Sequence, residues 1–515
     1  MMTPRAPRLS WPVWVTALVH AAAFAWAWPY IMDDALITYR YAHHVGQGLG
    51  PYWNVGGSLR PVEGFSSFLH MFLLGALNGL TRVDVEWLGK IAGLVFSLAT
   101  IVSIGWAARR DSLSPAGTWL ALSPFLLPPM VMASASGMET ALYVLLAWLT
   151  AMACLRLLTE PAQGGSVKTL VVLGLLGTLT RPEFALNAMG LFALVFWRKP
   201  ELRRSLVRSF LLLYGGVGLA ITVWRVVTYG DFVPNTFYVK QRLPGLWGLE
   251  YVGRFVLICV APYALIAAPA AARLWRERRD LVLVVLVSVG LPCLYFTSVR
   301  PLMGWWYRFL IPQLPILAWF AATAVSTAPA KGIARAVRLA GAACLAIFAV
   351  AHVPPILTEV PVRHLEDQLL GEVGRRIRPW AAADRSLSYY DIGRLPYAAG
   401  WNVVDVVGLT THRHDLHGDC GNATDLLLRA MNSSPPVPPK EIENPCPKLY
   451  DTLADLDFFV EQPILSRRMR IFARRNLTYR EPLRRALLEG WPAPYVFEGG
   501  WLANYQNTFG GWFGR

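Results

Sequence analysis

Two adjacent aspartates, Asp33 and Asp34, directly follow an apolar run in the segment "WPYIMDDALITYRYAHHVGQG" (28–48). Acidic side chains at the edge of a membrane segment are costly to place there, so they mark a candidate functional site. A carboxylate that reaches a hydroxyl group can remove its proton, which is general-base chemistry. In an extended segment the two side chains point to opposite faces, so that one can be catalytic and the other structural. The alternative is a helix over 35–45, because acids at a helix start stabilise its dipole.

Further charged residues lie in a loop and at the end of another apolar run. Glu63, in "RPVEGFSS" (60–67), is a candidate to bind ligand hydroxyls or to pair with Arg60; the alternative is a solvated loop charge. Arg181 and Glu183 flank Pro182 at the end of an apolar run. An Arg–Glu pair at the membrane edge is a functional candidate by default. The alternative is a structural ion pair that holds two helices together.

The composition places these residues in a membrane protein. Of the 515 residues, 55% are hydrophobic and only 16% are charged, whereas soluble domains are about 25% charged. The net charge of +15 raises the question of nucleic-acid binding. However, Lys and Arg occur in short clusters between apolar runs, a pattern that reports membrane topology instead. We therefore expect no nucleic-acid partner.

Apolar runs predict eleven transmembrane helices: 11–31, 89–108, 115–134, 140–158, 166–180, 184–198, 207–227, 251–272, 280–299, 309–327 and 335–353. The first run is about as long as a full span and has no clear small-residue cleavage site, so we interpret it as an anchor. A further run, 66–80, is short for a span. We expect it to form a helix that lies at, or dips into, the membrane surface.

Basic clusters between the apolar runs predict the orientation. Lys and Arg gather at 5–8, 109–110, 168, 198–208, 273–279 and 331–338. With eleven spans, all these clusters fall on the side of the N-terminus, which the positive-inside rule makes cytoplasmic. The outer face then carries the first outer loop (32–88), "SGMET" (136–140), "TRPEF" (180–184), "PNTFYVK" (234–240), "GWWYRFLIPQLP" (304–315) and the chain after 353.

Two of the outer-face segments carry cations and aromatic rings. Lys240 and Arg308 oppose the positive-inside bias, which indicates an anionic ligand such as a lipid phosphate. The alternative is that these side chains reach along the membrane to the interface. Tyr238, Trp305 and Trp306 can stack on a sugar or lie in the interfacial aromatic belt.

We predict an all-α polytopic membrane domain over 1–353 and a small extracytoplasmic α/β domain over 354–515. Val/Tyr runs with Gly/Pro breaks over 386–409 are typical of short strands. Cys420 and Cys446 lie in this second part and can form a disulfide if it is extracytoplasmic. The other four cysteines lie in apolar runs and are interpreted as buried thiols.

These motifs, taken in order, resemble a known family. The segment "DDALITYRYAHHVGQGLGPYWNVGGSLRPVEGFSSFL" (33–69) is similar to the first outer loop of the GT-C glycosyltransferases, in particular the branch of the terminal arabinofuranosyltransferases. "SGMET", "TRPEF", "PNTFYVK", "YRFLIPQLP" and "VVDVVGLT" also resemble motifs of that branch, and the resemblance runs from about 30 to 410.

The resemblance implies a multi-pass enzyme of the bacterial inner membrane with an extracytoplasmic active site. Such enzymes move a sugar, here expected to be arabinofuranose, from a polyprenyl-phosphate donor to a glycan, lipid or protein acceptor of the cell envelope, generally with inversion. Asp33 or Asp34 is then the expected base, and Lys240, Arg308 and Arg181 are expected to hold the phosphate. A divalent cation is compatible with this chemistry but not required, because Lys and Arg can neutralise a leaving monophosphate. The expected substrate-binding set is Arg40, Glu63, Arg181, Glu183, Tyr238, Lys240, Trp305, Trp306 and Arg308.

Three alternatives stay open. The same scaffold could transfer a different sugar, such as mannose or aminoarabinose. A transporter or flippase for lipid-linked sugars predicts polar residues at mid-span, whereas the motifs here lie at span ends. A non-catalytic scaffold for envelope assembly predicts that Asp33 and Asp34 tolerate replacement by Asn.

Overall fold

The computed structural model describes a chain that contact clustering divides into two compact units. The first comprises 1–35, 66–224 and 240–364, and the second comprises 36–65, 225–239 and 365–515. The described residues are 9–56, 59–160, 164–240, 247–299, 304–327, 330–381, 386–389, 392–405, 409–411, 458–461 and 470–473. Cys420 and Cys446 lie outside them, so their disulfide stays a prediction, as does the domain boundary after 353.

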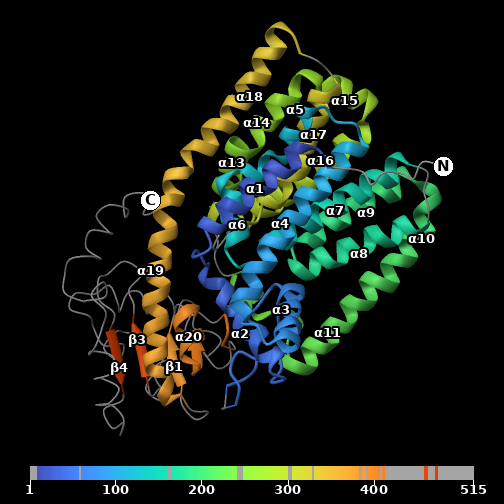
Figure 1. The fold of residues 1–515 in the computed structure, drawn as a ribbon. Helices are drawn as coiled ribbons and strands as arrows, with labels where there is room; N and C mark the ends of the chain where they lie inside the picture. Colours follow the sequence, from blue (N-terminus) through green and yellow to red (C-terminus); the bar gives the residue numbers. More distant parts are fainter. Residues whose placement is uncertain are drawn as a thin grey trace, which may run out of the picture. The chain divides into compact units, whose positions relative to one another are not determined.

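The first unit is helical (Figure 1). Its helices are α1 (Trp11–Trp26), α3 (Phe68–Thr81), α4 (Val85–Arg110), α5 (Pro115–Leu122), α6 (Pro128–Ala135), α7 (Thr140–Thr159), α8 (Gly164–Thr180), α9 (Phe184–Arg198), α10 (Arg203–Ser209), α13 (Trp247–Phe255), α14 (Ala261–Ala267), α15 (Ala271–Glu277), α16 (Arg279–Thr297), α17 (Leu314–Thr327) and α18 (Gly332–Ala351). Three further helices carry the chain between the units: α2 (Asp33–Gly46), α11 (Gly216–Tyr229) and α19 (Val353–Ile377).

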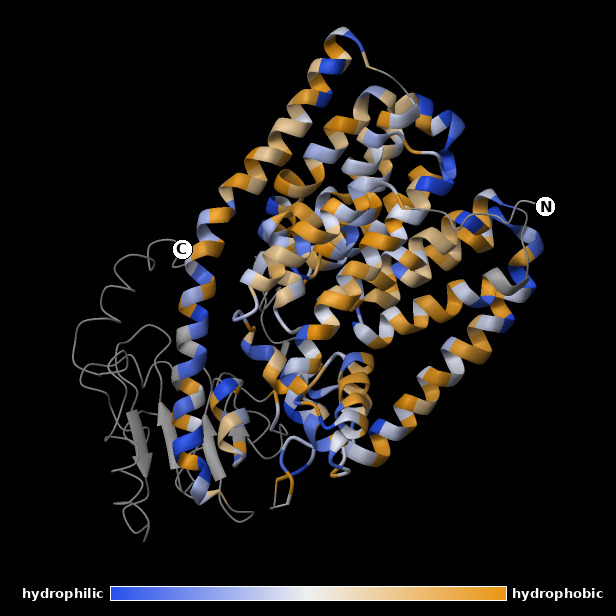
Figure 2. Cartoon of the chain, in the orientation of Figure 1, coloured by the Kyte–Doolittle hydropathy of each residue, from blue (hydrophilic) through white to orange (hydrophobic). Residues whose placement is uncertain are grey.

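The predicted membrane helices are present. Among the described residues, seven helical runs are long and apolar enough to cross a membrane, and the bent pair α5–α6 makes up to eight. The other three predicted spans coincide with shorter apolar helices, α1, α8 and α9. The run predicted to lie at the surface forms α3, a helix of 14 residues. Figure 2 shows the apolar residues that line these helices. The chain is therefore a multi-pass membrane protein, and the sidedness of its ends stays a prediction.

Helix α7 forms the centre of the first unit, while the run 200–229 lies at its apolar edge. Helix α7 packs against α4, α6, α8, α9, α16 and α17. Trp148 on α7 meets Trp319 on α17 edge to face, with ring centroids 5.4 Å apart. Of the apolar window of α7, 72% is buried inside the protein, against 6% for the run 200–229. A helix that is apolar yet not covered by protein is suited to face lipid.

Local sequence signals explain where the helices around the site begin. Asp84 precedes α4 and accepts a hydrogen bond from the Glu86 backbone N–H at 2.8 Å. Ser114 precedes α5 and accepts one from the Gly117 N–H at 3.1 Å, with Pro115 in the first helical position. Both are standard caps for the orphan N–H groups of a helix start.

The second unit contains a four-stranded sheet, which confirms the predicted small α/β part. Its strands are β1 (Ser386–Tyr389), β2 (Asn402–Asp405), β3 (Phe458–Glu461) and β4 (Arg470–Ala473), in the order β2-β1-β3-β4. Strand β1 is parallel to β2 and β3, and β4 is antiparallel to β3. Helix α20 (Arg394–Ala399) lies between β1 and β2 in the chain, and Gly400 ends it with φ +67°, a left-handed cap that suits glycine.

Candidate functional site

The two aspartates lie in the first turn of α2. The helical alternative is therefore correct, and the extended arrangement with the acids on opposite faces is wrong. Consecutive residues of an α-helix are about 100° apart, so the two carboxylates diverge without opposing each other. Acids in this position are favourable for the helix dipole. The start of α2 is fixed by the Met32 N–H, which donates to the Ser136 carbonyl at 3.0 Å.

Asp34 faces Arg308, one of the predicted outer-face cations. An Arg308 terminal nitrogen lies 3.3 Å from Asp34 Oδ2, and the other terminal nitrogen contacts the Met32 sulfur. The Arg308 side chain is 5% exposed and that of Asp34 is 24% exposed. Among the described residues, Arg308 Nε has no hydrogen-bond partner. A buried guanidinium donor without a partner is unfavourable unless a ligand or water supplies an acceptor.

Arg308 follows a turn with an unusual backbone. Trp306 and Tyr307 both have φ +56°, the left-handed region that residues other than glycine rarely adopt. Such residues cost about 1–3 kcal/mol each and persist where packing holds them. The Trp306 ring lies edge to face with His352, with centroids 6.2 Å apart, and Tyr307 packs against Phe255 at 5.8 Å. The predicted aromatic residues of this segment thus help to set the course of the chain into Arg308.

A second charged centre is built around Arg181. It binds Glu183, with Nε at 2.7 Å and Nη2 at 2.6 Å from Oε1, and Glu139, with Nη1 at 2.6 Å from Oε1. The Arg181 and Glu139 side chains are 8% and 3% exposed. Burial opposes the charge of Arg181, but Glu183 and Glu139 raise its pKa above the usual value. All three guanidinium nitrogens serve these carboxylates, so the geometry favours a positioning role for Arg181 over direct phosphate binding.

One aromatic ring links the two centres. The guanidinium carbons of Arg181 and Arg308 lie 4.8 Å and 4.9 Å from the centroid of the Phe309 ring. A guanidinium at this distance from a ring face is attracted by its quadrupole. Because both distances are below 5 Å, the two cations are no more than about 10 Å apart. Asp34, Arg308, Arg181, Glu139 and Glu183 therefore form one buried charged cluster.

Two members of this region are absent from the predicted site. Glu139 lies in the quoted "SGMET" segment but was not singled out as a site residue. Lys90 is buried in α4, where its ammonium donates to the Ala135 carbonyl at 2.6 Å and to the Tyr30 carbonyl. A lysine inside an apolar span is itself a signal of function or of special structure. That signal was available in the sequence.

Arg40 belongs to the second unit and holds backbone there. It donates to the carbonyls of Trp53 at 2.9 Å, Pro396 at 3.0 Å and Trp401 at 2.5 Å. Its guanidinium also lies 4.5 Å from the centroid of the Trp53 ring. Burial lowers the pKa of Arg40 to about 10. With its donors committed to three carbonyls, Arg40 is placed to hold the second unit together, and contact with substrate stays a prediction.

Glu63 is also committed within the second unit. Its carboxylate receives two hydrogen bonds from Arg225, at 2.5 Å and 2.9 Å, and its side chain is 3% exposed. Burial raises the pKa of Glu63, and Arg225 opposes that effect. Tyr238, on α12 (Asn235–Lys240), is half-buried. The side chain of Lys240 is outside the described part of the chain, so its proposed contact with phosphate rests on the sequence.

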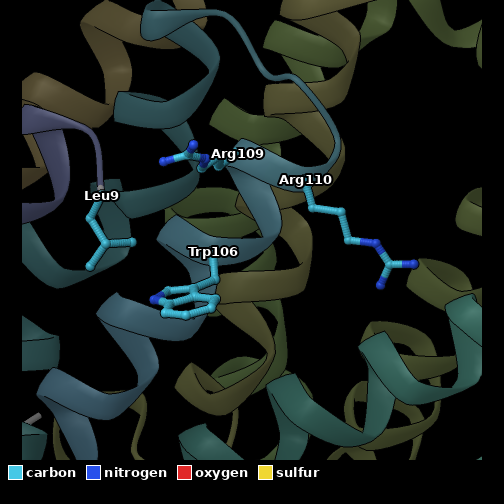
Figure 3. Close-up of a pocket in the computed structure, with 4 residues that line it drawn as sticks. All are labelled: Leu9, Trp106, Arg109 and Arg110. Atoms are coloured by element: carbon cyan, nitrogen blue, oxygen red, sulfur yellow. The ribbon is translucent and has the colours of Figure 1, made fainter. Parts of the chain in front are cut away.

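A pocket of about 240 Å³ lies at the other end of α4 (Figure 3). Leu9, Trp106, Arg109 and Arg110 line it, and the Arg110 guanidinium points away from Trp106. Lys90 and Arg109 are separated along α4 by about 28 Å at 1.5 Å per residue. The pocket is therefore remote from the end of α4 that Lys90 ties to Tyr30 and Ala135.

Two curated proteins are similar to this chain. The terminal beta-(1->2)-arabinofuranosyltransferase of Mycobacterium tuberculosis is 29% identical over 281 residues, which cover 49% of this chain and 42% of that protein. The protein of the same name from Corynebacterium glutamicum is 27% identical over 314 residues, covering 52% and 42%. The chain thus matches less than half the length of these relatives. They confirm the resemblance to terminal arabinofuranosyltransferases.

Solved structures of ArnT from Cupriavidus metallidurans are also similar. The structure bound to undecaprenyl phosphate has a TM-score of 0.49 and 14% sequence identity, covering 77% of this chain and 86% of that one. The apo structure has the same TM-score and 13% identity, covering 76% and 85%. No protein-family model matches the chain.

Proposed function

We propose that this protein is an inverting membrane glycosyltransferase that moves a sugar from a polyprenyl-phosphate donor to a cell-envelope acceptor on the outer face of the membrane. The observation that carries the proposal is the Asp34–Arg308 pair, a partly exposed carboxylate beside a buried guanidinium that has an uncommitted Nε. A base next to an anion-binding cation is what transfer from a lipid phosphate requires.

In the proposed reaction, Asp34 takes the proton of the acceptor hydroxyl. The hydroxyl oxygen forms a bond to the anomeric carbon while the bond from that carbon to the phosphate oxygen breaks on the opposite face. The polyprenyl phosphate leaves with the bonding electrons, and Arg308 stabilises its developing charge. Lys240 is proposed as a second cation for the phosphate. Only Asp34 Oδ2 contacts Arg308, so Oδ1 is the proposed proton acceptor.

Arg181 has a different part in this proposal. Its nitrogens are bound to Glu139 and Glu183, so it positions the cluster from within and leaves Arg308 to meet the anion. The Arg181–Glu183 pair thus combines both interpretations of the sequence motif: it is a structural ion pair, and it supports a functional one. Trp305, whose side chain is 39% exposed in the turn before Arg308, is proposed to stack on the sugar.

The sugar is proposed to be arabinofuranose. The support is the shared name of the two curated relatives, together with the ordered motifs between about 30 and 410. The acceptor is proposed to be a glycan, lipid or protein of the envelope. The cytoplasmic N-terminus and the extracytoplasmic second domain are supported by the placement of the basic clusters.

The test is transfer from labelled polyprenyl-phosphate arabinose and polyprenyl-phosphate mannose by membranes that carry the wild type, Asp33→Asn or Asp34→Asn. We expect transfer from the arabinose donor, with a loss of about 100-fold or more in Asp34→Asn, the scale of general-base catalysis. Glu250→Gln is the matched control, because Glu250 is exposed and pairs only within α13 to Arg254 among the ion pairs described. Full transfer by Asp34→Asn would refute Asp34 as the base, and loss in Asp33→Asn alone would move the role to Asp33.

A further inference from the structure

Glu139 is a buried carboxylate directly before α7 that the proposed reaction does not use. Its residue is 2% exposed, and its Oε1 lies 2.6 Å from an Arg181 terminal nitrogen. A carboxylate this deep in a membrane protein is retained only with a compensating charge. Arg181 supplies one, but Arg181 is already paired with Glu183. The charge of Glu139 is therefore available to another cation.

Arg308 is that cation. It lies 4.9 Å from the Phe309 ring centroid, while Arg181 lies 4.8 Å from the same centroid. Burial alone raises the pKa of Glu139, but Arg181 first, then Arg308 and His70, hold it below its usual value. Arg308 thus stands in the field of two carboxylates, Glu139 and Asp34.

The Arg308–Asp34 pair is loose compared with its neighbours. Its N–O distance is 3.3 Å, whereas both carboxylates on Arg181 lie at 2.6 Å. Charge-assisted hydrogen bonds are usually about 2.7–2.9 Å long. A carboxylate clamped tightly by a guanidinium is a poor proton acceptor, because its ionised form is stabilised. A loose pair keeps Asp34 next to the cation and still able to accept a proton.

We propose that Glu139 is a positioning residue for the transfer step: it shares the charge of Arg308 with Asp34 and thereby keeps the Asp34 carboxylate available as the base. The proposal rests on the proposed function. The charged and titratable groups concerned are Arg181 and His70 around Glu139, and Asp33 next to Asp34. Glu183 binds the same Arg181 as Glu139, which makes it the natural comparison.

The test compares Glu139→Gln with Glu183→Gln, because each variant removes one carboxylate from Arg181. In Glu139→Gln, Arg308 turns wholly to Asp34, so we expect kcat for transfer to fall about 10-fold or more while KM for the donor changes less than about 3-fold. In Glu183→Gln, kcat per folded molecule stays within about 3-fold of wild type. Glu139→Asp keeps the charge and should recover part of the lost kcat. Equal losses of kcat in the two Gln variants would overturn the proposal, because they indicate only damage to the Arg181 ion pairs.

A second readout needs no transferase activity. Carbodiimides react with protonated carboxyl groups, and Asp34 is partly exposed. At one fixed, mildly acidic pH, we expect mass spectrometry to show slower labelling of Asp34 in Glu139→Gln than in wild type, and unchanged labelling in Glu183→Gln. If the wild type transfers no sugar, the proposed function fails while this comparison still decides the role of Glu139: unchanged labelling in Glu139→Gln refutes it. Should Glu139→Gln not fold, Glu139→Asp carries both readouts, and wild-type values for that variant support the charge-sharing role only if Glu139→Ser, the smaller uncharged variant, loses them.

Discussion

Asn54 and Val403 pair in the second unit as two strand residues would, although one partner is a side chain. The Asn54 amide nitrogen donates to the Val403 carbonyl at 3.0 Å, and the Val403 N–H donates to the Asn54 amide oxygen at 2.8 Å. The side chain thus extends the hydrogen bonding of β2 to the first loop, 349 residues away in sequence.

Replacing Asn54 by Ala should therefore destabilise the second unit. Two backbone groups of Val403 lose their partners, and each unsatisfied buried group costs about 1–3 kcal/mol. Thermal unfolding in a fixed detergent measures the change. Asn54→Asp keeps the acceptor and loses the donor, so its Tm should fall between wild type and Asn54→Ala. A Tm for Asn54→Ala equal to wild type would show that water replaces the amide.

Lys90→Met should lower both stability and transfer. The lysine closes two carbonyls, at Tyr30 and Ala135, that flank the Met32–Ser136 backbone bond at the start of α2. A Met of similar length fills the space but leaves both carbonyls unpaired, at about 1–3 kcal/mol each. We expect a lower Tm and a kcat reduced together with it, because Asp34 loses its fixed support. Lys90→Arg retains donors and serves as the control; a loss as large as that of Lys90→Met would contradict this account.

Arg40→Lys separates the structural role of Arg40 from the substrate contact predicted for it. One ammonium cannot reach the three carbonyls of Trp53, Pro396 and Trp401 that the guanidinium fork serves. The Tm should fall, while KM for the donor, measured on the folded fraction, should stay at the wild-type value. A raised KM without a change in Tm would restore the substrate-binding interpretation.

Acidification should weaken the attachment of the first loop to α2 through His44. The His44 Nδ1–H donates to the Tyr52 carbonyl at 2.6 Å, and burial, followed by nearby Arg40, lowers the pKa of His44 from 6.5 to about 4. Between these two pKa values the unfolded chain binds a proton that the folded chain does not, so stability falls as the pH drops from about 6.5 to about 4. Tm measured at pH 7 and pH 5 should decrease less in His44→Gln than in wild type. Equal decreases would assign the pH dependence to other groups.

Sequence patterns were enough to place most helices but not most pairs of charges. Apolar runs such as 140–158 and 184–198 predict α7 and α9 almost to the residue, because a membrane helix must be apolar over its length. The strands β1 and β2 also follow from local Val/Tyr patterns. By contrast, the partner of Asp34 is 274 residues away and that of Glu63 is 162 residues away. Such pairs depend on how helices pack, which no local pattern reports.

The sequence also identified the right motifs more reliably than the right residues. Asp34, Arg308, Arg181 and Glu183 meet in one cluster, as their membership of the outer-face motifs suggested. Arg40 looked like a ligand-binding cation because its backbone partners are invisible in the sequence. Glu139 went unselected because only the fold shows that it shares Arg181 with Glu183.

The sparsely covered run 200–229 makes the bilayer a component of this fold as much as any helix. Thirty residues of helix span about 45 Å, more than the roughly 30 Å hydrocarbon layer. Such a segment is matched to its membrane by tilt and by local thickness. On extraction, a micelle must supply the surface that acyl chains supplied before. Purification in lipid nanodiscs of native thickness is therefore a condition for studying the intact molecule, because this run ends beside Arg225, whose side chain secures Glu63.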